Sequence, residues 1–437
     1  MKDIVLTING VEPGLRDALL IHEKEMGVKL KGLVLVDSSF ALDIDRPKDD
    51  SGIFTEIICN FDDQDEMQKL LKPYLDRIVA VTCRFEASIQ TFRKLIPFIP
   101  YVETPSESSL LWSTEKPLMR DRLHSFNPDI VPKYQYLESS DINDISNLLS
   151  DFSYPVIVKP SSLASSLLVT KCDNEYDLKI CLRNTFRSID NIYKREHRTG
   201  KPGLLVEEMM QGNMYSTDAY VNRNGDIYCL PLIKVITADS IGLPGFYGYR
   251  CVFTTNLPKN EIDDAFTVAK MAVKALNLRS TTAHIELFRT PQGWKIIELG
   301  ARIGGYREAL YREGYGINHY YNDLAIRMGK EPVMPTGFIN HSTCLNIYAD
   351  KEGTIESIIG IEEARKLSST VFIESHAKPG DKALFASNGG RLVVDAILSN
   401  KDPELLEKDV VKLHELLKIN IKEKAVLEPR RRKSLAL

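Results

Sequence analysis

Hydrophobic and polar positions follow two different periods along the first hundred residues. Short apolar runs with the length of buried strands lie at 4–8, 33–36 and 78–83. Apolar residues at helical spacing lie at 15–26 and 85–96, and these stretches end at Gly27 and Pro97. Strands and helices in this order predict a small open parallel sheet. The turn after the first strand is not G-x-G-x-x-G, so we predict no dinucleotide site there.

From residue 154 onward the pattern changes to strands joined by turns. An apolar strand is predicted at 154–160, with Lys159 near its end. The hydroxyl-rich loop Ser161 to Ser166 follows and leads to a second apolar run at 167–169, which we predict to be a strand. Further strands are predicted at 204–212, on both sides of 222–225, and at 344–348, 370–374 and 392–396. Helical spacing is found at 261–276, 308–329 and 404–417.

One hairpin carries two acidic residues on the same predicted face. Residues 283, 285 and 287 alternate with residues 284, 286 and 288 in the two-residue period of a strand with two different faces, and a returning strand follows the turn 291–293. A three-residue loop at that turn places Glu286 opposite Glu298. Directly opposed residues lie roughly 4.5–5.5 Å apart at Cβ. Two carboxylates at this separation repel each other unless a cation lies between them.

Carboxylate oxygens favour Mg²⁺, which proteins bind through one or two carboxylates together with substrate phosphates. Arg302, Gly304 and Gly305 follow the second strand and offer a fixed cation and backbone that can approach a ligand closely. We therefore predict a metal–phosphate site at this hairpin. For a hairpin considered alone, two solvated glutamates are the alternative.

Composition limits the class of protein. The chain has 437 residues, which suggests about three domains, and its 43% hydrophobic and 27% charged residues are typical of a soluble globular protein. The net charge of −4 argues against a nucleic-acid partner. Seven cysteines without a C-x-x-C pair are typical of reduced thiols, and no signal peptide or membrane span is predicted. We predict a cytoplasmic protein.

The order H-x-E, turn, strand and E-x-x-x-R-x-G-G, with a strand lysine upstream, resembles ATP-grasp enzymes and, by pattern, the L-amino-acid ligases, which are carboxylate–amine ligases. The resemblance implies an α/β fold, with α+β character in the nucleotide-binding part. It implies four parts, namely an N-terminal open parallel-sheet domain at 1–110, a lid subdomain at 111–206, a catalytic subdomain at 207–335 and a small C-terminal α+β domain at 336–437.

The resemblance also implies roles for individual residues. Glu286 and Glu298 would hold Mg²⁺, with Mn²⁺ as the alternative ion, and Arg302 would hold the transferred phosphoryl group or the acyl phosphate. ATP contacts are expected from Lys116, Lys159, Ser165, Ser166, Glu207, Glu208, Met209 and Met210. Lys116 would share a helical face with Arg120, for which a solvated helix surface is the alternative.

Substrate contacts are expected from Lys234, Arg250, Arg302, Gly304 and Gly305. Lys234 and Arg250 are placed near a loop rich in glycine and aromatic residues at 240–249, which could shape the acceptor pocket. Ordinary surface charge is the alternative for both.

Three features depart from the family pattern. Gly300 occupies the position of an asparagine metal ligand, so either water replaces the amide or a second metal is held less tightly. Met214 occupies the position of a ribose-binding glutamate, for which Asp218 is a candidate substitute. The loop Ser161 to Ser166 contains no glycine, whereas the family's mobile lid usually does.

These expectations describe an ATP- and Mg²⁺-dependent ligase. It would activate a small-molecule carboxylate, that of an amino acid, as an acyl phosphate and join it to an amine, releasing ADP and phosphate. A carrier-protein thiol is an alternative acceptor, and a homodimer is compatible with the resemblance. A non-catalytic ATP-binding module and a kinase-like phosphotransferase also stay open as functions of this chain.

Overall fold

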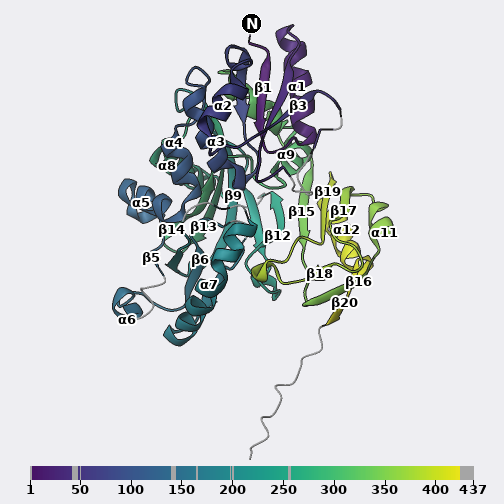
Figure 1. Cartoon of the computed structure of the whole chain (residues 1–437). Helices are drawn as coiled ribbons and strands as arrows, with labels where there is room; N and C mark the ends of the chain where they lie inside the picture. Colours follow the sequence, from purple (N-terminus) through teal and green to yellow (C-terminus); the bar gives the residue numbers. More distant parts are fainter. Residues whose placement is uncertain are drawn as a thin grey trace, which may run out of the picture.

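The computed structural model describes residues 2–41, 48–49, 51–138, 144–163, 166–196, 198, 201–253 and 257–423. Ser165, one of the predicted ATP contacts, lies outside these ranges. Figure 1 shows an N-terminal part, a part beside helix α7 and a part formed by the C-terminal strands, which meet at the centre of the molecule. No helix in the described ranges is both long and apolar enough to cross a membrane.

The N-terminal part contains the parallel sheet that the sequence predicts. The order is β3-β2-β1-β4, from the strands β1 (Ile4–Ile8), β2 (Lys31–Asp37), β3 (Phe54–Cys59) and β4 (Ile78–Thr82). Helix α1 (Pro13–Met26) ends as predicted at Gly27, whose φ of 62° costs glycine little. The other α-helices of this part are α2 (Gln64–Leu71) and α3 (Ile89–Leu95).

The hydrophobic pattern did not predict β3 or α2. Strand β3 is an edge strand whose middle residues are largely exposed, so it lacks a continuous apolar run. Helix α2 buries only Met67 and Leu71, and its first turn is held by Asp63, whose carboxylate accepts a hydrogen bond from the backbone N–H of Glu66. Both elements form because the adjacent sheet offers a surface that a short apolar stripe can cover.

A second sheet lies beside the long helix α7 (Glu175–Arg195). Its order is β5-β8-β6-β7, from the strands β5 (Tyr134–Leu137), β6 (Val156–Pro160), β7 (Thr170–Cys172) and β8 (Leu204–Glu208). Between the first sheet and β6 the chain also forms α4 (Glu107–Thr114), α5 (Lys116–Phe126) and the short α6 (Ile145–Leu148). The strand predicted at 167–169 is wrong, because residues 166–168 form a turn in which Leu168 has a φ of 60°.

The largest sheet has nine strands within the described residues, ordered β14-β13-β9-β11-β12-β15-β19-β17, with β10 paired to β9. The strands are β9 (Asn213–Val221), β10 (Ile227–Cys229), β11 (Ile233–Thr237), β12 (Gly248–Phe253), β13 (Thr281–Thr290), β14 (Gly293–Gly300), β15 (His341–Ile347), β17 (Thr370–Ser375) and β19 (Val394–Asn400). Cys344 of β15 pairs with Cys251 of β12. The sheet therefore runs without a break across the boundary predicted at residue 335.

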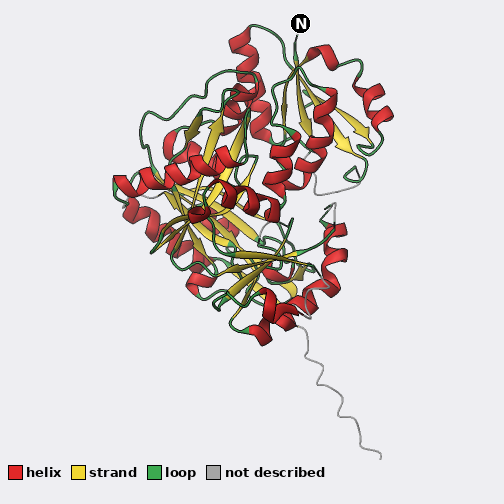
Figure 2. Ribbon diagram, turned by 90° about the vertical axis from the view of Figure 1, so that its left-hand side faces the viewer, coloured by secondary structure: helices red, strands yellow, loops and turns green. Residues whose placement is uncertain are grey.

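Helices pack on the sheets in layers, as Figure 2 shows. Helix α8 (Lys259–Ala275) contacts β13 and β14, and buries Ala269 and Val273 as its predicted apolar stripe requires. The predicted helix 308–329 is two helices, α9 (Arg307–Tyr315) and α10 (His319–Arg327), separated at the predicted glycines. The C-terminal part adds α11 (Ile361–Arg365), α12 (Pro403–Leu416) and a small sheet of β16 (Gly353–Ile359), β18 (Lys382–Ala383) and β20 (Lys418–Glu423).

The hairpin β13–β14 places Glu286 directly opposite Glu298, although the predicted loop length is wrong. Thr290 pairs with Gly293, so the loop has two residues and not three. A β-bulge at Ile297 restores the alignment by adding one residue to β14 between the pair Leu287–Ile296 and the glutamate pair. Without the bulge Glu298 would lie on the other face of the sheet, because one residue of slip exchanges the two faces.

Candidate active site

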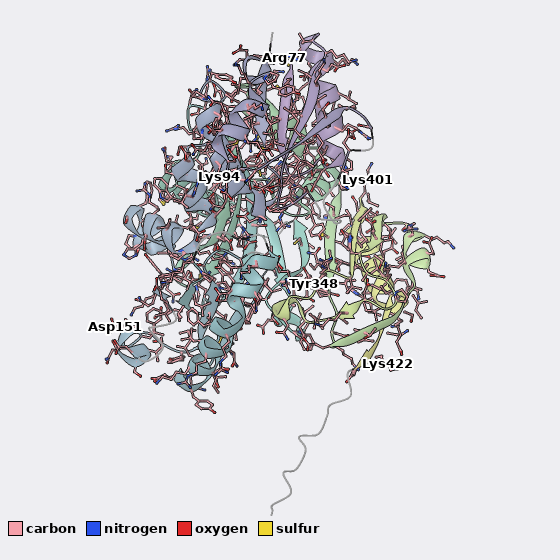
Figure 3. All side chains as sticks on the ribbon, in the orientation of Figure 1. Arg77, Lys94, Asp151, Tyr348, Lys401 and Lys422 are labelled. Carbon is pink, nitrogen blue, oxygen red and sulfur yellow. The ribbon has the colours of Figure 1, made fainter. Side chains whose placement is uncertain are left out.

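A cavity of about 620 Å³ lies between the four-stranded sheet β5-β8-β6-β7 and the nine-stranded sheet. Strands β6 and β8 line it on one side, and β9, β11, β12, β13 and β14 line it on the other. The C-terminal part contributes Asn346 and Tyr348, the latter labelled in Figure 3 near the centre of the molecule. The predicted residues that line this cavity are Lys116, Lys159, Ser166, Glu207, Glu208, Met209, Met210, Glu286, Glu298, Arg302 and Gly305.

The two opposed glutamates have different neighbours. Glu298 Oε1 lies 3.0 Å from Lys116 Nζ, which also donates a hydrogen bond of 2.6 Å to the carbonyl of Leu163. Glu286 Oε1 lies 3.4 Å from His284 Nε2. Burial works to raise the pKa of Glu286, but the hydrogen bond and charge of His284 outweigh it, so its pKa lies below the ordinary value. Glu286 is therefore a carboxylate at neutral pH.

A fully buried aspartate fixes His284. Asp218 Oδ1 lies 2.6 Å from His284 Nδ1, and Oδ2 lies 2.8 Å from His319 Nε2 and accepts a 2.8 Å hydrogen bond from the backbone N–H of Gly304. Burial works to lower the pKa of His284, but the charge of Asp218 raises it above the ordinary value. A protonated imidazole donates from both nitrogens, which matches the carboxylates on its two sides.

This network corrects two predictions. Asp218 has no exposed surface and its two oxygens already bind His284, His319 and Gly304, so its side chain does not take the place of the ribose-binding glutamate. Gly304 does not line the cavity. A Cβ at Gly304 would lie 2.4 Å from His284 Nδ1, so this glycine is needed for close packing under the site.

Lys159 belongs to a buried charge cluster, as does Arg120. Glu207 joins them, with Oε2 at 2.6 Å from Lys159 Nζ and Oε1 at 2.6 Å from Arg120 Nε. Arg120 also donates a 2.6 Å hydrogen bond to the carbonyl of Ile297, the bulged residue of β14. The alternative of a solvated helix surface does not hold for Arg120, because only 1% of this residue is exposed. The Glu207 side chain thus holds two cations, of which Lys159 lines the cavity and Arg120 is buried behind it.

Arg302 is held by a residue from the N-terminal part. Its Nε donates a 2.6 Å hydrogen bond to Glu86 Oε2, and its NH1 donates to the carbonyl of Ile303 at 3.0 Å. A Cβ at Gly300 would lie 3.0 Å from the same Glu86 oxygen. The glycine at the position of the family's asparagine therefore leaves room for Glu86, whose carboxylate orients Arg302.

Lys234 and Arg250 are not among the residues that line the cavity. Lys234 lies on β11 between Ile233 and Val235, and the cavity receives Val235, so strand alternation directs Lys234 to the other face. Arg250 forms an ion pair with Glu407 and donates to the hydroxyl of Thr343 at 3.0 Å. Both residues that were predicted to contact the substrate therefore lie outside the lining of the cavity.

The sequence reasoning missed several residues of the cavity wall. Asp239 and Arg307 are charged, and Tyr247, Tyr306 and Tyr348 are aromatic. Glu86, which orients Arg302 without lining the cavity itself, was also missed. The glycine- and aromatic-rich composition of residues 240–249 did indicate a pocket wall, and Ser240, Phe246, Tyr247 and Gly248 line the cavity. Nothing in the local pattern indicated the others, because an acidic residue after a strand or an arginine at a helix start is usually solvated.

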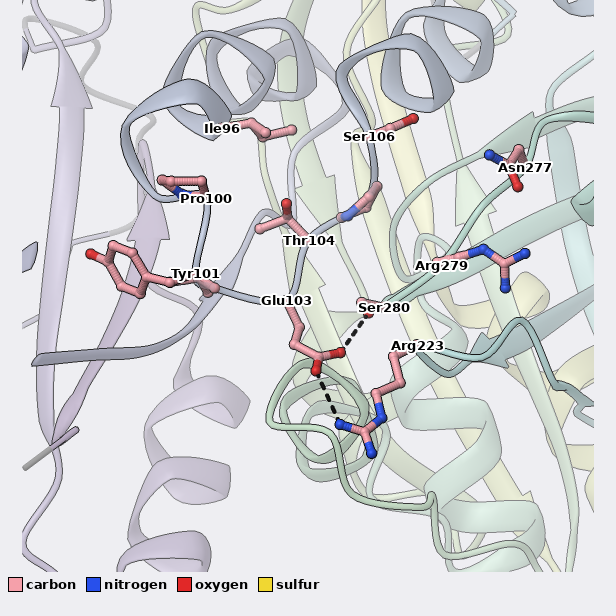
Figure 4. A pocket seen from close by; sticks show the side chains of 12 residues that line it. Ile96, Pro100, Tyr101, Glu103, Thr104, Ser106, Arg223, Asn277, Arg279 and Ser280 are labelled. Atoms are coloured by element: carbon pink, nitrogen blue, oxygen red, sulfur yellow. Dashed lines mark hydrogen bonds and ion pairs between the residues drawn. The ribbon is translucent and has the colours of Figure 1, made fainter. Parts of the chain in front are cut away.

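A second pocket of about 500 Å³ lies on the surface between residues 96–106 and the β9–β10 and α8–β13 connections. Figure 4 shows Glu103 crossing it to Arg223, at 3.4 Å, and to Ser280, at 3.4 Å. Its lining includes none of the predicted catalytic or ATP-binding residues. The 620 Å³ cavity is therefore the candidate active site.

Comparison with known proteins defines the class of protein. Residues 152–309 match the family described as the ATP-grasp domain, a range that contains Lys159, Glu286, Glu298 and Arg302. The chain therefore contains an ATP-grasp domain, and its architecture is the ATP-grasp fold.

The particular relatives are ligases. The chain is 24% identical over 309 residues to the L-arginine-specific L-amino acid ligase of Bacillus subtilis, covering 70% of each protein. It is 24% identical over 202 residues to the D-alanine–D-alanine ligase of Streptococcus gordonii, covering 44% of this chain and 52% of that protein. The crystal structure of the L-amino acid ligase from Bacillus licheniformis superposes with a TM-score of 0.77 at 18% identity, covering 97% of this chain and 99% of that chain. The resemblance indicated by the motifs is confirmed.

Proposed function

We propose that the protein is an ATP- and Mg²⁺-dependent carboxylate–amine ligase that activates an amino acid as its acyl phosphate, joins it to an amine and releases ADP and phosphate. One observation carries the proposal. Two directly opposed carboxylates, Glu286 and Glu298, share a cavity with three fixed cations, Lys116, Lys159 and Arg302. Similarity to amide-forming ligases supports it.

The carboxylate pair fits the metal that the family uses. Glu286 is ionised and faces Glu298 across one ladder position, and Mg²⁺ favours one or two carboxylates plus substrate phosphates. In this proposal both glutamates hold Mg²⁺, which neutralises phosphate charge when it is bound. Asp218 and His284 hold Glu286 in place from behind.

Of the remaining cavity residues, some would bind the nucleotide and others would bind the acyl phosphate. Met209 and Met210, with Glu208, line the wall that precedes β9, where the adenine would meet mainly backbone groups. Lys159 and Lys116 would neutralise the phosphates. Arg302, oriented by Glu86, would stabilise the charge that develops on the acyl phosphate as the amine attacks. Fixed cations do this at low cost because they need not reorganise during the reaction.

The test is phosphate release from ATP and Mg²⁺ by the purified protein in the presence of pooled amino acids, with mass spectrometry of the products. We expect phosphate together with a new amide mass. In a Glu298→Gln variant both are expected to fall by at least about 100-fold, because the amide removes one negative ligand of the metal.

Different outcomes would point to a different function. Tight ATP binding without turnover on any amine would identify a binding module. Transfer to a carrier-protein thiol would appear as a protein-bound acyl group. AMP and pyrophosphate as products would contradict the acyl-phosphate mechanism.

A further inference from the structure

Arg307 differs from the cavity cations that the sequence predicted, which are Lys116, Lys159 and Arg302. Its residue is 5% exposed, and it lines the cavity from the first position of α9. The guanidinium donates to Ser216 Oγ at 2.9 Å, and to Cys251 Sγ and the carbonyl of Gly305 at 3.3 Å each. Its Nε is buried and has no hydrogen-bond partner within the described part of the chain. All three partners of the guanidinium are neutral.

The other cavity cations each have a carboxylate. Lys116 pairs with Glu298, Lys159 with Glu207, and Arg302 with Glu86. Among the described residues, no carboxylate lies within ion-pair distance of Arg307. A buried charge without a counter-charge is costly, and a guanidinium best recovers that cost with a carboxylate that binds through two parallel hydrogen bonds.

The position of Arg307 separates it from the phosphate cations. Ser216 on β9 lies directly beside Glu286, and Cys251 lies on β12, two strands further from the hairpin of the glutamates. This part of the cavity is lined by Tyr247 and Tyr348, whose ring centroids are 4.3 Å apart. Lys116 and Lys159 approach the cavity from the opposite side, where β14 and β6 lie.

We propose that Arg307 binds the carboxylate of the amine substrate and thereby selects acceptors that carry one. The inference rests on the proposed ligase function. The acceptor's carboxylate would pair with the guanidinium, its side chain would lie against Tyr247 and Tyr348, and its amine would face the acyl phosphate near Glu286 and Arg302. Arg307 is then a specificity-determining residue and takes no part in the phosphoryl transfer.

The experiment compares an amino acid with its carboxamide as acceptor, at a fixed carboxylate donor and saturating ATP and Mg²⁺. The wild type is expected to use the free acid with a kcat/KM about 100-fold above that of the amide, because the amide leaves the buried guanidinium without a counter-charge. In Arg307→Gln we expect the ratio of kcat/KM for the acid to kcat/KM for the amide to fall to about one. The change is expected to come from a higher KM for the acid. The KM for ATP is expected to stay within about twofold.

Arg250→Gln is the matched control. It removes an arginine one position from Cys251 that pairs with Glu407 outside the cavity, so the acid-to-amide ratio is expected to stay at the wild-type value. Arg307→Lys retains the charge but not the planar pair of donors, and part of the preference for the acid is expected to return.

The outcomes separate this inference from the proposed function. A wild type that forms no amide with any amine contradicts the ligase function. A wild type that uses acid and amide equally well, or an Arg307→Gln variant that slows both acceptors by the same factor, overturns the role of Arg307 while the ligase function stands. Should Arg307→Gln not fold, the wild-type ratio and the Arg307→Lys variant decide the question.

Discussion

Charged residues of the cavity hold one another in place. Lys159 and Arg120 are both almost fully buried and depend on Glu207 for their counter-charge. Burial works to raise the pKa of Glu207, but the charges of Arg120 and Lys159 keep it below the ordinary value. Each of the three groups would be unfavourable in the interior without the others.

Removing the charge of Glu207 tests this dependence. In Glu207→Gln two buried cations lose their shared carboxylate, so the free energy of unfolding is expected to fall by about 3 kcal/mol. Chemical denaturation with urea at pH 7 measures it. Glu208→Gln, one residue along the same strand and partly exposed, is the control and is expected to change stability by less than about 0.5 kcal/mol. Equal losses in the two variants would contradict the role of Glu207 as a shared counter-charge.

His22 provides a pH dependence far from the cavity. It is fully buried between α1 and α10, its ring stacks on Tyr321 at 4.2 Å, and its Nε2 donates to the Tyr321 carbonyl at 3.0 Å. Burial lowers the pKa of His22, and the charge of Lys330 adds to this, although the carbonyl of Tyr321 and the charge of Glu25 oppose it. The native state therefore holds the neutral imidazole.

The sign of the effect follows from the two pKa values. The unfolded chain takes up the proton near pH 6.5, above the folded pKa, so the contribution of His22 is complete above pH 6.5 and is lost as the pH falls through that value. Between pH 7.5 and 5.5 the wild type is expected to lose more stability than His22→Gln, by up to about 1 kcal/mol. Urea titrations at both pH values measure the difference, and parallel curves for the two proteins would contradict it.

At the scale of elements, the turn at residues 166–168 contacts the C-terminal part. The N–H of Leu168 donates to the carbonyl of Ser387 at 3.1 Å, and Arg195 at the end of α7 lies against Gly389. Leu168 has a positive φ, which costs a leucine about 1 kcal/mol, so this contact helps to maintain a turn that the residue itself disfavours. Ser166, in the same turn, lines the cavity.

A shift of the backbone around Ser387 is expected to break its hydrogen bond to Leu168 and so to destabilise the turn at 166–168. A Cβ at Gly390 would lie 2.0 Å from the carbonyl oxygen of Leu384, so Gly390→Ala must shift the backbone around Ser387. We expect hydrogen exchange at the Leu168 amide to become at least about tenfold faster and the affinity for ATP to fall. Gly380→Ala has a glycine φ of 97° but nothing within 4 Å of the added Cβ, so it is the control and is expected to leave this exchange unchanged. Unchanged exchange in Gly390→Ala would contradict the role of the contact.

At the scale of the whole molecule, the described C-terminal strands continue the sheet that carries Glu286 and Glu298. Strand β15 pairs with β12, and one buried cluster contains Phe253 and Leu310 together with Cys344 and Ile397. The cavity also takes Asn346 and Tyr348 from this part. We infer that residues 341–423 form one cooperative unit with the rest of the large sheet.

Truncation tests this inference. A chain that ends at residue 336 exposes the long edge of β12 and part of the buried cluster, so it is expected to aggregate or to melt without a cooperative transition. Size-exclusion chromatography and thermal circular dichroism measure both properties. A chain that ends at Glu423 is the control and is expected to melt like the full chain. A soluble, cooperatively folded product of the shorter truncation would show instead that the C-terminal part is an independent domain.

The sequence by itself determined the local elements and the central motif. Periodicity predicted β1, α1 and α8, because regular burial on one face leaves a repeating pattern. The motif predicted the pairing of Glu286 with Glu298 and the class of fold, because both depend on residues close together in the chain. The loop length was wrong, yet the pairing was right, since the bulge at Ile297 corrects the register.

Only the tertiary structure decided which distant residues complete the site. Glu86 reaches Arg302 across more than two hundred residues, and Arg307 is buried over β9 and β12, whereas Lys234 and Arg250 are turned away. A charged residue carries no local sign of its partner, because the Coulomb energy that fixes its place depends on distance in space and on burial. Residue type and spacing thus determined the chemistry at the hairpin, and packing of the sheets determined the rest of the cavity.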